Sequence, residues 1–483
     1  MIGGGLAGLS SAVVLAEAGL HVRLLEKRPH LGGRATSYTL PDGTEVDNCQ
    51  HLALGCCNNL ADFYRRVGAS GKIRTYDRMF LVDAEGRTST IEAGVLPPPL
   101  HMVESLASFR SLSTADKRGI ASAMLAIARA GGRPPDIAGL SMLDWLHRMN
   151  QTPGAIKRFW RAVLVSSLDE ELGRTDAHFG IDVFWKAFLG NRGGYRVSIP
   201  SVPLAQLYEG CLGAIERRGG EVLLRSGVRE IRVGENGFAG AVLEDGSEVT
   251  ADASIAALTH DVLPGVLPTA MSEPGGPLAG LREMRNSPIT SVHLWFDRMV
   301  MRGPYLALLD HTTQWIFNKT FLYAEVGTNG SRPRPILQSA SAGGAGGQYL
   351  QLVISASYDL VPRSRQEIIE LCLRELAEVL PETRDAKLLK ATVIKELNAT
   401  FSPEPGVDRL RPGQESGARN LFFAGDFTRT GWPATMEGAV RSGYLAAEAV
   451  LASAGRPQKV LLPELVFEGL SKFWAKRAEA GRG

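Results

Sequence analysis

The chain of 483 residues contains few cysteines and no long apolar run. Its five cysteines are odd in number and lack the spacing of a metal site, so we expect free thiols, no bound metal and a reducing, cytoplasmic compartment. Cys56 and Cys57 are adjacent, and we interpret them as two small, partly buried residues rather than a strained vicinal disulfide. No run approaches the roughly 18 apolar residues of a membrane-spanning helix, and no basic and apolar leader opens the chain.

An excess of charge of one sign is also missing. The 53 basic and 51 acidic residues give a net charge of +2, which provides no global field for a polyanion, so we expect no nucleic-acid partner. With 44% hydrophobic and 22% charged residues, the composition is that of a globular protein large enough for two or three packed units.

The start of the chain carries a G-x-G-x-x-G turn. Such glycines permit a tight turn, a close approach of the backbone to a pyrophosphate, and close packing of the next helix. Residues 10–18 predict that helix and residues 21–25 predict the next strand, which ends at Glu26, where a carboxylate can accept the hydroxyls of an adenosine ribose. Arg34 follows two further glycines and is interpreted as a pyrophosphate contact. The predicted cofactor contacts here are Gly3, Gly5, Leu6, Ala7, Gly8, Glu26, Lys27, Gly33 and Arg34.

The first strand of this unit is unusually short. Only Met1 and Ile2 precede the glycines, whereas such a strand normally has about five residues. Either the strand is vestigial, or several apolar residues belong upstream of this start. We expect an apolar N-terminal extension to raise stability and cofactor retention.

A second part of the nucleotide site is predicted near the other end of the chain. Residues 420–426 indicate a buried strand that ends in Gly425 and Asp426, and residues 440–452 indicate a helix of small residues. Asp426 is placed to bind the polyol of a flavin, and the backbone N–H groups of Thr435 and Met436 can stabilise negative charge at its pyrimidine end. These features favour FAD over NAD. Since no second G-x-G-x-x-G with a trailing acid is present, NAD(P)H or a redox protein must deliver electrons from outside.

The segments between these ends predict a discontinuous cofactor domain. Residues 221–224, 227–233, 240–243 and 248–251 indicate a small β-meander, and residues 253–257 a further strand. We assign 1–56, 205–262 and 410–455 to an FAD-binding domain, 57–204 and 263–409 to a substrate domain, and 456–483 to a tail or amphipathic helix. The substrate domain mixes helices at 114–130 and 364–380 with strands at 290–296 and 348–355, and loops at 329–335 and 343–347.

Several motifs carry a family resemblance that extends to about residue 455. They are Val46 to Cys56 with its D-N-C-Q-H run, Phe188 to Gly190, Ile289 to Asp297, Thr400 to Pro403, and the G-W-P-A-T-M-E-G-A run at 431–439. The chain resembles the FAD-dependent amine oxidase and phytoene desaturase superfamily, and within it the hydroxysqualene dehydroxylase family, also called squalene-associated FAD-dependent desaturases. Cys49 replaces a glycine of this pattern, and it would be strained if the site needed a positive φ.

The resemblance implies a mixed α/β fold with a discontinuous Rossmann-like FAD-binding domain of the glutathione-reductase type. It also implies reductive removal of the hydroxyl from hydroxysqualene to give squalene, a step of hopanoid supply, with reduced FAD as hydride donor. Such a site needs an apolar sleeve for a C30 isoprenoid, a proton donor and exclusion of water. A phytoene-type desaturase, an amine oxidase and a non-catalytic isoprenoid carrier with a residual nucleotide fold are the alternatives. By the family pattern, Val228 would offer backbone hydrogen bonds to adenine.

Four residues are candidates for the chemistry. Asp47 or His51 is a candidate proton donor, and Gln50 a group that orients the alcohol or a flavin edge. The alternative is that Asp47 caps a turn and His51 is a satisfied core imidazole. Trp432 is a candidate to frame the substrate and to stabilise cationic charge through its π face, or else it packs under the cofactor.

Two segments combine apolar and basic residues. Residues 95–103, and 461–474 with Lys472, Lys476, Arg477 and Arg482, have the composition of a shallow contact with the inner face of the cytoplasmic membrane. The alternative is a helix docked on the protein's own core.

Overall fold

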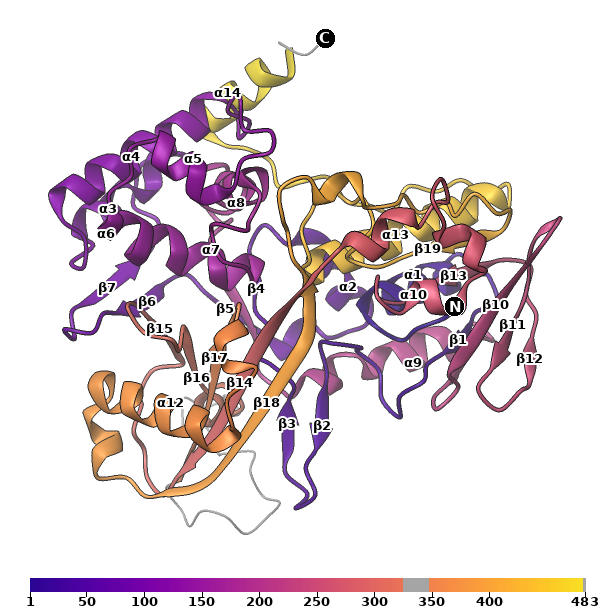
Figure 1. The fold of residues 1–483 in the computed structure, drawn as a ribbon, viewed down its shortest axis with the longest axis horizontal. Coiled ribbons are helices and arrows are strands. Elements are labelled where there is room, and N and C mark those ends of the chain that lie inside the picture. Colours follow the sequence, from indigo (N-terminus) through magenta and orange to yellow (C-terminus); the bar gives the residue numbers. More distant parts are fainter. Residues whose placement is uncertain (325–346, 481–483) are drawn as a thin grey trace.

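The computed structural model describes residues 1–324 and 347–480, with side chains up to residue 478. Figure 1 shows a parallel sheet with its helices, a second, mixed sheet and a group of helices. The mixed α/β architecture predicted from the sequence is confirmed. The predicted loop at 329–335, most of the loop at 343–347, and Arg482 lie outside the described residues.

The parallel sheet is assembled from distant parts of the chain. Its strands are β1 (Arg23–Leu25), β9 (Glu221–Leu223), β13 (Ser254–Ala256) and β19 (Leu421–Phe423). β9 pairs with β1, and β13 pairs with β19, both in parallel. Ile2 lies between these pairs, because it forms parallel bridges to Leu25 and Ala256. The first strand is therefore reduced to one bridging residue at the centre of the sheet.

Four helices cover this sheet: α1 (Leu6–Glu17), α2 (Asn58–Arg66), α9 (Glu209–Glu216) and α13 (Met436–Ser453). α1 is buried from Leu6 to Ala16, as its small apolar residues predict. A Cβ on Gly443 of α13 would lie 2.3 Å from the carbonyl oxygen of Ala7, so glycine is needed for the two helices to pack this closely. α2 lies beyond the predicted boundary at residue 56, yet it packs in the same core as α1 and α13.

An antiparallel meander extends from this layer. It consists of β10 (Val228–Gly234), β11 (Gly237–Leu243) and β12 (Glu248–Val249). The prediction that residues 221–224 belong to the meander is wrong, because these residues form β9 and pair with β1 in the parallel sheet. A short apolar run fits either sheet, and its partner is decided by the topology.

The second sheet has seven strands in the order β18, β14, β17, β16, β15, β6, β7. The long strands β14 and β18 reach from this sheet to the parallel layer (Figure 1). Helix α12 (Arg365–Val379) shares a core with it. The predicted strands at 290–296 and 348–355 and helix at 364–380 are confirmed. The strands are β6 (Met79–Val82), β7 (Thr88–Ile91), β14 (Asn286–Phe296), β15 (Tyr305–Leu308), β16 (Trp315–Asn318), β17 (Gln348–Ile354) and β18 (Leu388–Phe401).

The helical part lies above the second sheet in Figure 1. Helix α4 begins with a capping box between Ser113 and Asp116, which satisfies its first backbone N–H groups. Within residues 1–324 and 347–480, no helix has the length and apolar content needed to cross a bilayer. The helices of this part are α3 (Val103–Ser108), α4 (Thr114–Arg129), α5 (Met142–Arg148), α6 (Pro153–Ala155), α7 (Arg161–Leu168), α8 (Ala177–Val183) and α14 (Gly469–Ala480).

Short elements join these parts. Smaller sheets contain β2 (Ser37–Thr39), β3 (Glu45–Asp47), β4 (Ala53–Leu54), β5 (Ile73–Tyr76) and β8 (Val197–Pro200), and two short helices are α10 (Leu263–Val266) and α11 (Lys319–Leu322).

Candidate active site

The glycine turn follows Ile2 directly and leaves no room for side chains. A Cβ on Gly8 would lie 1.9 Å from the carbonyl oxygen of Gly3, and one on Gly3 would lie 2.4 Å from that of Ala257. Gly3 also has a φ of +102°, which favours glycine. The turn brings the N-terminus of α1, with buried Leu6 and Ala7, to the carboxyl edge of the parallel sheet. Ligands bind at this edge in open α/β sheets.

Glu26 is fixed beside the turn. Its Oε2 accepts a hydrogen bond from Gly4 N at 2.6 Å, and its Oε1 accepts one from Arg28 N at 2.7 Å. Each carboxylate oxygen retains a lone pair, so Glu26 can still accept the two hydroxyls of a ribose. Lys27 points away, because its Nζ pairs with Glu244 at 2.7 Å on the exposed surface. Val228 opens β10, two residues after Ser226, whose N–H donates to the carbonyl oxygen of Glu26.

Replacing Glu26 by glutamine is expected to weaken FAD binding about tenfold, because ribose hydroxyls then donate to a neutral amide instead of a carboxylate. Titrating the apoprotein with FAD by flavin fluorescence checks this. Glu248→Gln, which changes an exposed acid of the meander, is the matched control and should leave the dissociation constant unchanged. Equal affinities in both variants would contradict the role of Glu26.

Arg34 and Asp426 join the two ends of the chain. Arg34 Nη2 lies 2.6 Å from Asp426 Oδ2, and Arg34 Nη1 donates to the carbonyl oxygen of Ala399 at 2.9 Å. Asp426 follows β19 and Gly425, whose φ of +150° turns the chain at this point. The sequence predicted both residues as cofactor contacts, and the structure brings them together although 392 positions separate them.

Buried polar atoms around this pair fit a polar ligand. His260 follows β13 and is 3% exposed, and its Nε2 has no hydrogen-bond partner within the described chain. His30 Nε2 and Asn48 Oδ1 are also buried without partners there. His30 lies between Glu26 and Gly33, and Asn48 N donates to the carbonyl oxygen of Thr36. Since buried polar atoms are normally paired, these residues fit a dinucleotide with many hydrogen-bonding groups.

The N-terminus of α13 provides the predicted second contact. Thr435 is its N-cap and accepts a hydrogen bond from Gly438 N at 3.0 Å, and Met436 is the first helical residue. The unpaired N–H groups and the dipole of an 18-residue helix favour negative charge here.

Trp432 is 6% exposed and already has partners. Its Nε1 donates to Glu464 at 2.8 Å. The Lys186 ammonium lies 4.8 Å from the ring centroid, and the Arg441 guanidinium lies 5.9 Å from it. Because two cations already interact with the ring, the geometry favours packing for Trp432 over the predicted stabilisation of a substrate cation.

Asp47 lies at the centre of a buried network. Its Oδ1 accepts hydrogen bonds from Ser37 Oγ at 2.6 Å and Leu204 N at 2.9 Å. Its Oδ2 accepts from Lys319 Nζ at 2.7 Å and Tyr323 Oη at 2.8 Å. Burial alone would raise the pKa of Asp47, but the Lys319 ammonium and these hydrogen bonds outweigh it and hold the pKa below its usual value. Asp47 is therefore an anion that fixes its neighbours, which fits a positioning role better than the predicted role of proton donor.

Gln50 and His51 are connected to this network. Gln50 Oε1 accepts from Lys319 Nζ at 2.7 Å, and Gln50 Nε2 donates to the carbonyl oxygen of His51 at 3.0 Å. His51 Nδ1 lies 3.1 Å from the carbonyl oxygen of Cys49. Burial lowers the pKa of His51, so its imidazole is neutral at pH 7. The structure therefore brings Asp47, Gln50 and His51 together, as predicted, but around a lysine that the sequence analysis missed.

Cys49 is buried, and its φ lies outside the left-handed region, so the strain considered from the sequence does not arise. All five cysteines of the chain are free thiols, as expected. Burial raises the pKa of the Cys49 thiol, so this thiol is not a nucleophile.

Asp169 is a second residue that the sequence analysis missed. It follows α7 and is buried, and burial raises its pKa well above the usual value, although Ala356 N and Thr400 Oγ1 donate to its carboxyl at 2.7 and 2.9 Å. Thr400 follows Ala399, whose carbonyl oxygen accepts a hydrogen bond from Arg34. Asp169 thus lies between the D-N-C-Q-H run and the Arg34 contact, and its carboxyl retains a proton above the pH at which an exposed aspartate loses it.

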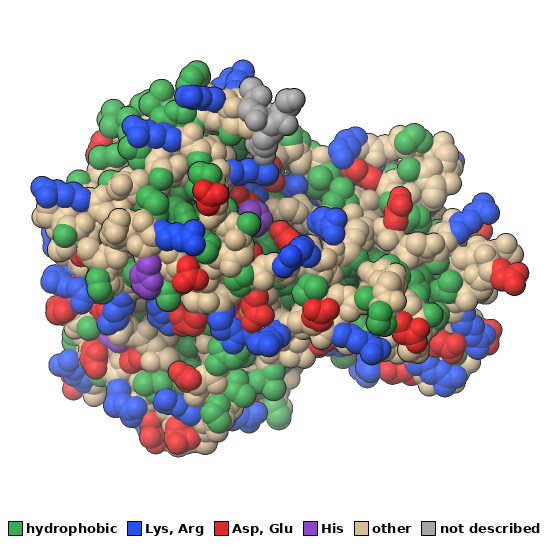
Figure 2. Space-filling view, turned by 45° about the horizontal axis from the view of Figure 1, so that its top comes forward, with side chains coloured by type: hydrophobic (Ala, Val, Ile, Leu, Met, Phe, Trp, Pro, Cys, Tyr) green, Lys and Arg blue, Asp and Glu red, His purple; other side chains and the backbone are tan. Residues whose placement is uncertain are grey.

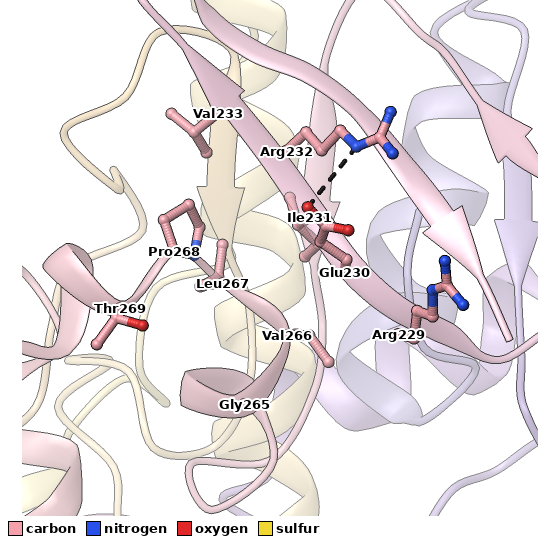
Figure 3. A pocket seen from close by; sticks show the side chains of 10 residues that line it. All are labelled: Arg229, Glu230, Ile231, Arg232, Val233, Gly265, Val266, Leu267, Pro268 and Thr269. Atoms are coloured by element: carbon pink, nitrogen blue, oxygen red, sulfur yellow. Dashed lines mark ion pairs between the residues drawn. The ribbon is translucent and has the colours of Figure 1, made fainter. Parts of the chain in front are cut away.

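A separate hollow of about 420 Å³ lies between β10 and residues 265–269 (Figure 3). Arg229 and Arg232 point away from Leu267 and Pro268 in this view, and Arg232 pairs with Glu230 at 3.6 Å. None of the predicted site residues lines this hollow, so it is not the candidate active site.

Comparison with known proteins supports a flavin cofactor at this site. A glycine turn after the first strand position, a buried acid and the Arg34–Asp426 contact at the edge of a parallel sheet are the parts of a dinucleotide-binding site. The family model described as flavin containing amine oxidoreductase matches residues 6–451, so the chain belongs to this family and its cofactor is FAD.

Two curated relatives are carotenoid desaturases by name. The chain is 27% identical to 15-cis-phytoene desaturase, chloroplastic/chromoplastic, of Solanum lycopersicum, over 95% of this chain and 79% of that protein. It is 26% identical to zeta-carotene desaturase of Synechocystis sp., over 96% and 99%. Among solved structures, putrescine oxidase bound to putrescine matches with a TM-score of 0.67 at 15% identity, covering 93% of this chain and 98% of that one. An oxidoreductase from Methanosarcina mazei matches with a TM-score of 0.69 at 18% identity, covering 93% and 99%.

Proposed function

We propose that this FAD-dependent oxidoreductase acts on a long isoprenoid, and that its reaction is the reductive removal of the hydroxyl group of hydroxysqualene to give squalene. The observation that carries this proposal is Asp169, a buried carboxyl with a raised pKa beside the D-N-C-Q-H run. An allylic hydroxyl leaves as water only after it is protonated, and a carboxyl whose pKa is raised by burial keeps its proton to a higher pH and can donate it.

A cation on the substrate also needs an apolar environment that excludes water. Asp169 ends α7, and the helical part that precedes it has an aromatic core, in which the ring centroid of Trp160 lies 4.6 Å from that of Phe184 and Phe159 stacks on Phe184 at 5.7 Å.

The proposed reaction needs one proton and one hydride and releases one water. Asp169 protonates the hydroxyl, the C–O bond breaks and water leaves. FAD, when bound and reduced, supplies the hydride that forms the new C–H bond. The Asp47–Lys319 network holds Gln50 and the backbone of His51 in place and does not exchange protons. An external donor, NAD(P)H or a redox protein, must reduce the cofactor again.

Anaerobic incubation of the photoreduced holoenzyme with hydroxysqualene tests the proposal. We expect up to one squalene per flavin, identified by mass spectrometry, together with the return of the oxidised flavin spectrum. Oxidised holoenzyme and photoreduced free FAD are the controls, and neither should form squalene. Photoreduced holoenzyme that stays reduced and forms no squalene would refute the proposed reaction.

A second candidate is an isoprenoid desaturation, which the names of the two curated relatives favour. A hydride would then pass from the isoprenoid to oxidised FAD, and a proton would leave the neighbouring carbon as the double bond forms. Anaerobic mixing of oxidised holoenzyme with phytoene distinguishes the two, since only a desaturase would bleach the flavin spectrum and form an additional double bond.

A further inference from the structure

An apolar face remains exposed where residues 95–103 meet residues 466–473. Val95 is 81% exposed, Val466 70% and Phe473 61%. These are three of the four large apolar side chains of the described chain that are more than 60% exposed. Leu96, Leu100, Val103 and Leu470 are also exposed in these segments. We call these seven residues the apolar face.

Hydrogen bonds hold the two segments of the apolar face together. Leu470 N donates to the carbonyl oxygen of Pro98 at 3.0 Å. The Arg192 guanidinium donates to the carbonyl oxygens of Val95 and Leu96 at 3.2 and 3.3 Å, and Arg192 N donates to Glu468 Oε2 at 3.1 Å. The exposed apolar side chains are therefore carried by a fixed backbone.

A basic hollow lies beside this face. Arg129, Arg133 and Arg477 line a hollow of about 610 Å³ together with Trp474. Within residues 1–324 and 347–478, none of the three arginines has an ion-pair partner, so their guanidinium groups can bind an anion. Arginine binds phosphate groups through two parallel hydrogen bonds. The hollow thus has the charge and the donors of a site for phosphate-bearing headgroups.

Helix α14 adds further positive charge. Lys472 and Lys476 are exposed on it, and the only acid in its sequence is Glu479, in its last turn. Glu468, just before the helix, is bound to Asn191 and Arg192. In Figure 2, green side chains gather with blue ones at the upper left, beside the grey terminal residues.

We propose that the apolar face and the basic hollow dock on a bilayer that contains anionic phospholipids. The apolar side chains enter the boundary of the acyl region, the arginines bind headgroup phosphates, and Trp474 lies at the interface. This inference depends on the surface alone and holds whichever isoprenoid reaction the site performs.

Co-sedimentation of the full-length holoenzyme with vesicles tests this. We expect binding to vesicles of phosphatidylcholine with phosphatidylglycerol, and much weaker binding to phosphatidylcholine alone. The triple variant R129Q/R133Q/R477Q should lower the partition coefficient about a hundredfold, since each basic residue contributes roughly fivefold near an anionic surface. The matched control R363Q/R365Q/R374Q removes the same charge from exposed positions around α12 and should bind as the wild type does.

The apolar part is tested separately with V95S/F473S. Salt screens the arginine contacts but not apolar burial, so this variant should lose the binding that persists at high salt. Retention of the flavin spectrum shows that each variant is folded. The proposal is overturned if the wild type does not bind anionic vesicles, or if both triple variants lose binding equally. It is also overturned if sedimentation without lipid shows a dimer that F473S dissociates, because the face would then be an interface between copies of this chain.

Discussion

Replacing Lys319 by methionine is expected to lower the free energy of unfolding by about 3–5 kcal/mol, because it leaves an uncompensated buried charge on Asp47. Both side chains are fully buried, and Lys319 Nζ is the cation that contacts Asp47, at 2.7 Å. Gln50 Oε1 loses its donor as well, since it accepts from the same ammonium. Urea denaturation of the holoenzyme, followed by flavin fluorescence and circular dichroism, measures the loss.

The double variant K319M/D47N provides the decisive comparison. It removes both charges together, so it should recover most of the stability lost in the single variant. Lys27→Met is the matched control, because its pair with Glu244 is exposed and should contribute less than about 1 kcal/mol. The assigned role of Lys319 would be contradicted if K319M had the same free energy of unfolding as the wild type, or if K319M/D47N had no higher a free energy of unfolding than K319M.

The pH dependence of stability follows from the same pair. In the folded wild type the pKa of Asp47 is lowered, so its stabilisation is present above the unfolded value of about 4 and is lost as the pH falls. In K319M, burial of the unpaired carboxyl raises this pKa above the unfolded value. The contribution of this carboxyl to the stability of the variant is then largest below pH 4 and falls as the pH rises, the opposite direction from the wild-type contribution.

The cofactor site was predictable from sequence because its signals are local. The turn from Gly3 to Gly8, the acid at Glu26 and the run that ends at Asp426 are each recognised from a few neighbouring residues, and their chemistry follows from backbone geometry. Their assembly was also predictable in outline, since parallel strands bring their carboxyl ends to one edge. The sequence did not show that Arg34 would pair directly with Asp426.

Lys319 and Asp169 were missed because their roles depend on distant partners. Lys319 contacts Asp47, although 272 sequence positions separate them. The contact exists because β16 lies inside the seven-stranded sheet and places α11 beside the D-N-C-Q-H run. A lysine directly after the apolar strand Trp315–Asn318 was the only local signal. Asp169 lies in an ordinary polar run after a helix, and its burial by Ala356 and Thr400 cannot be seen in that run.

Replacing Asp169 by asparagine is expected to lower the turnover of hydroxysqualene by about 10²–10⁴-fold, the usual contribution of a general acid. Asparagine has nearly the same shape: its Oδ1 can still accept from Ala356 N, and its Nδ2 can donate to Thr400 Oγ1, so FAD content and folding should be retained. The matched control is Asp297→Asn, which should remain fully active. Asp297 is a partly exposed carboxyl that directly follows the last residue of β14.

The pH profile separates an acid from a merely structural carboxyl. Burial raises the pKa of Asp169, so the wild-type kcat/KM should be constant at low pH and fall as the pH rises through that pKa, because the proton donor is then lost. The residual activity of the asparagine variant should not show this decline, since the amide does not titrate. A variant with wild-type turnover, or one that keeps the same decline with pH, would show that another group protonates the leaving hydroxyl. Phytoene oxidation requires a proton acceptor instead of a donor, so a desaturase that used Asp169 would become faster as the pH rises through its pKa, and the direction of the pH profile separates the two reactions.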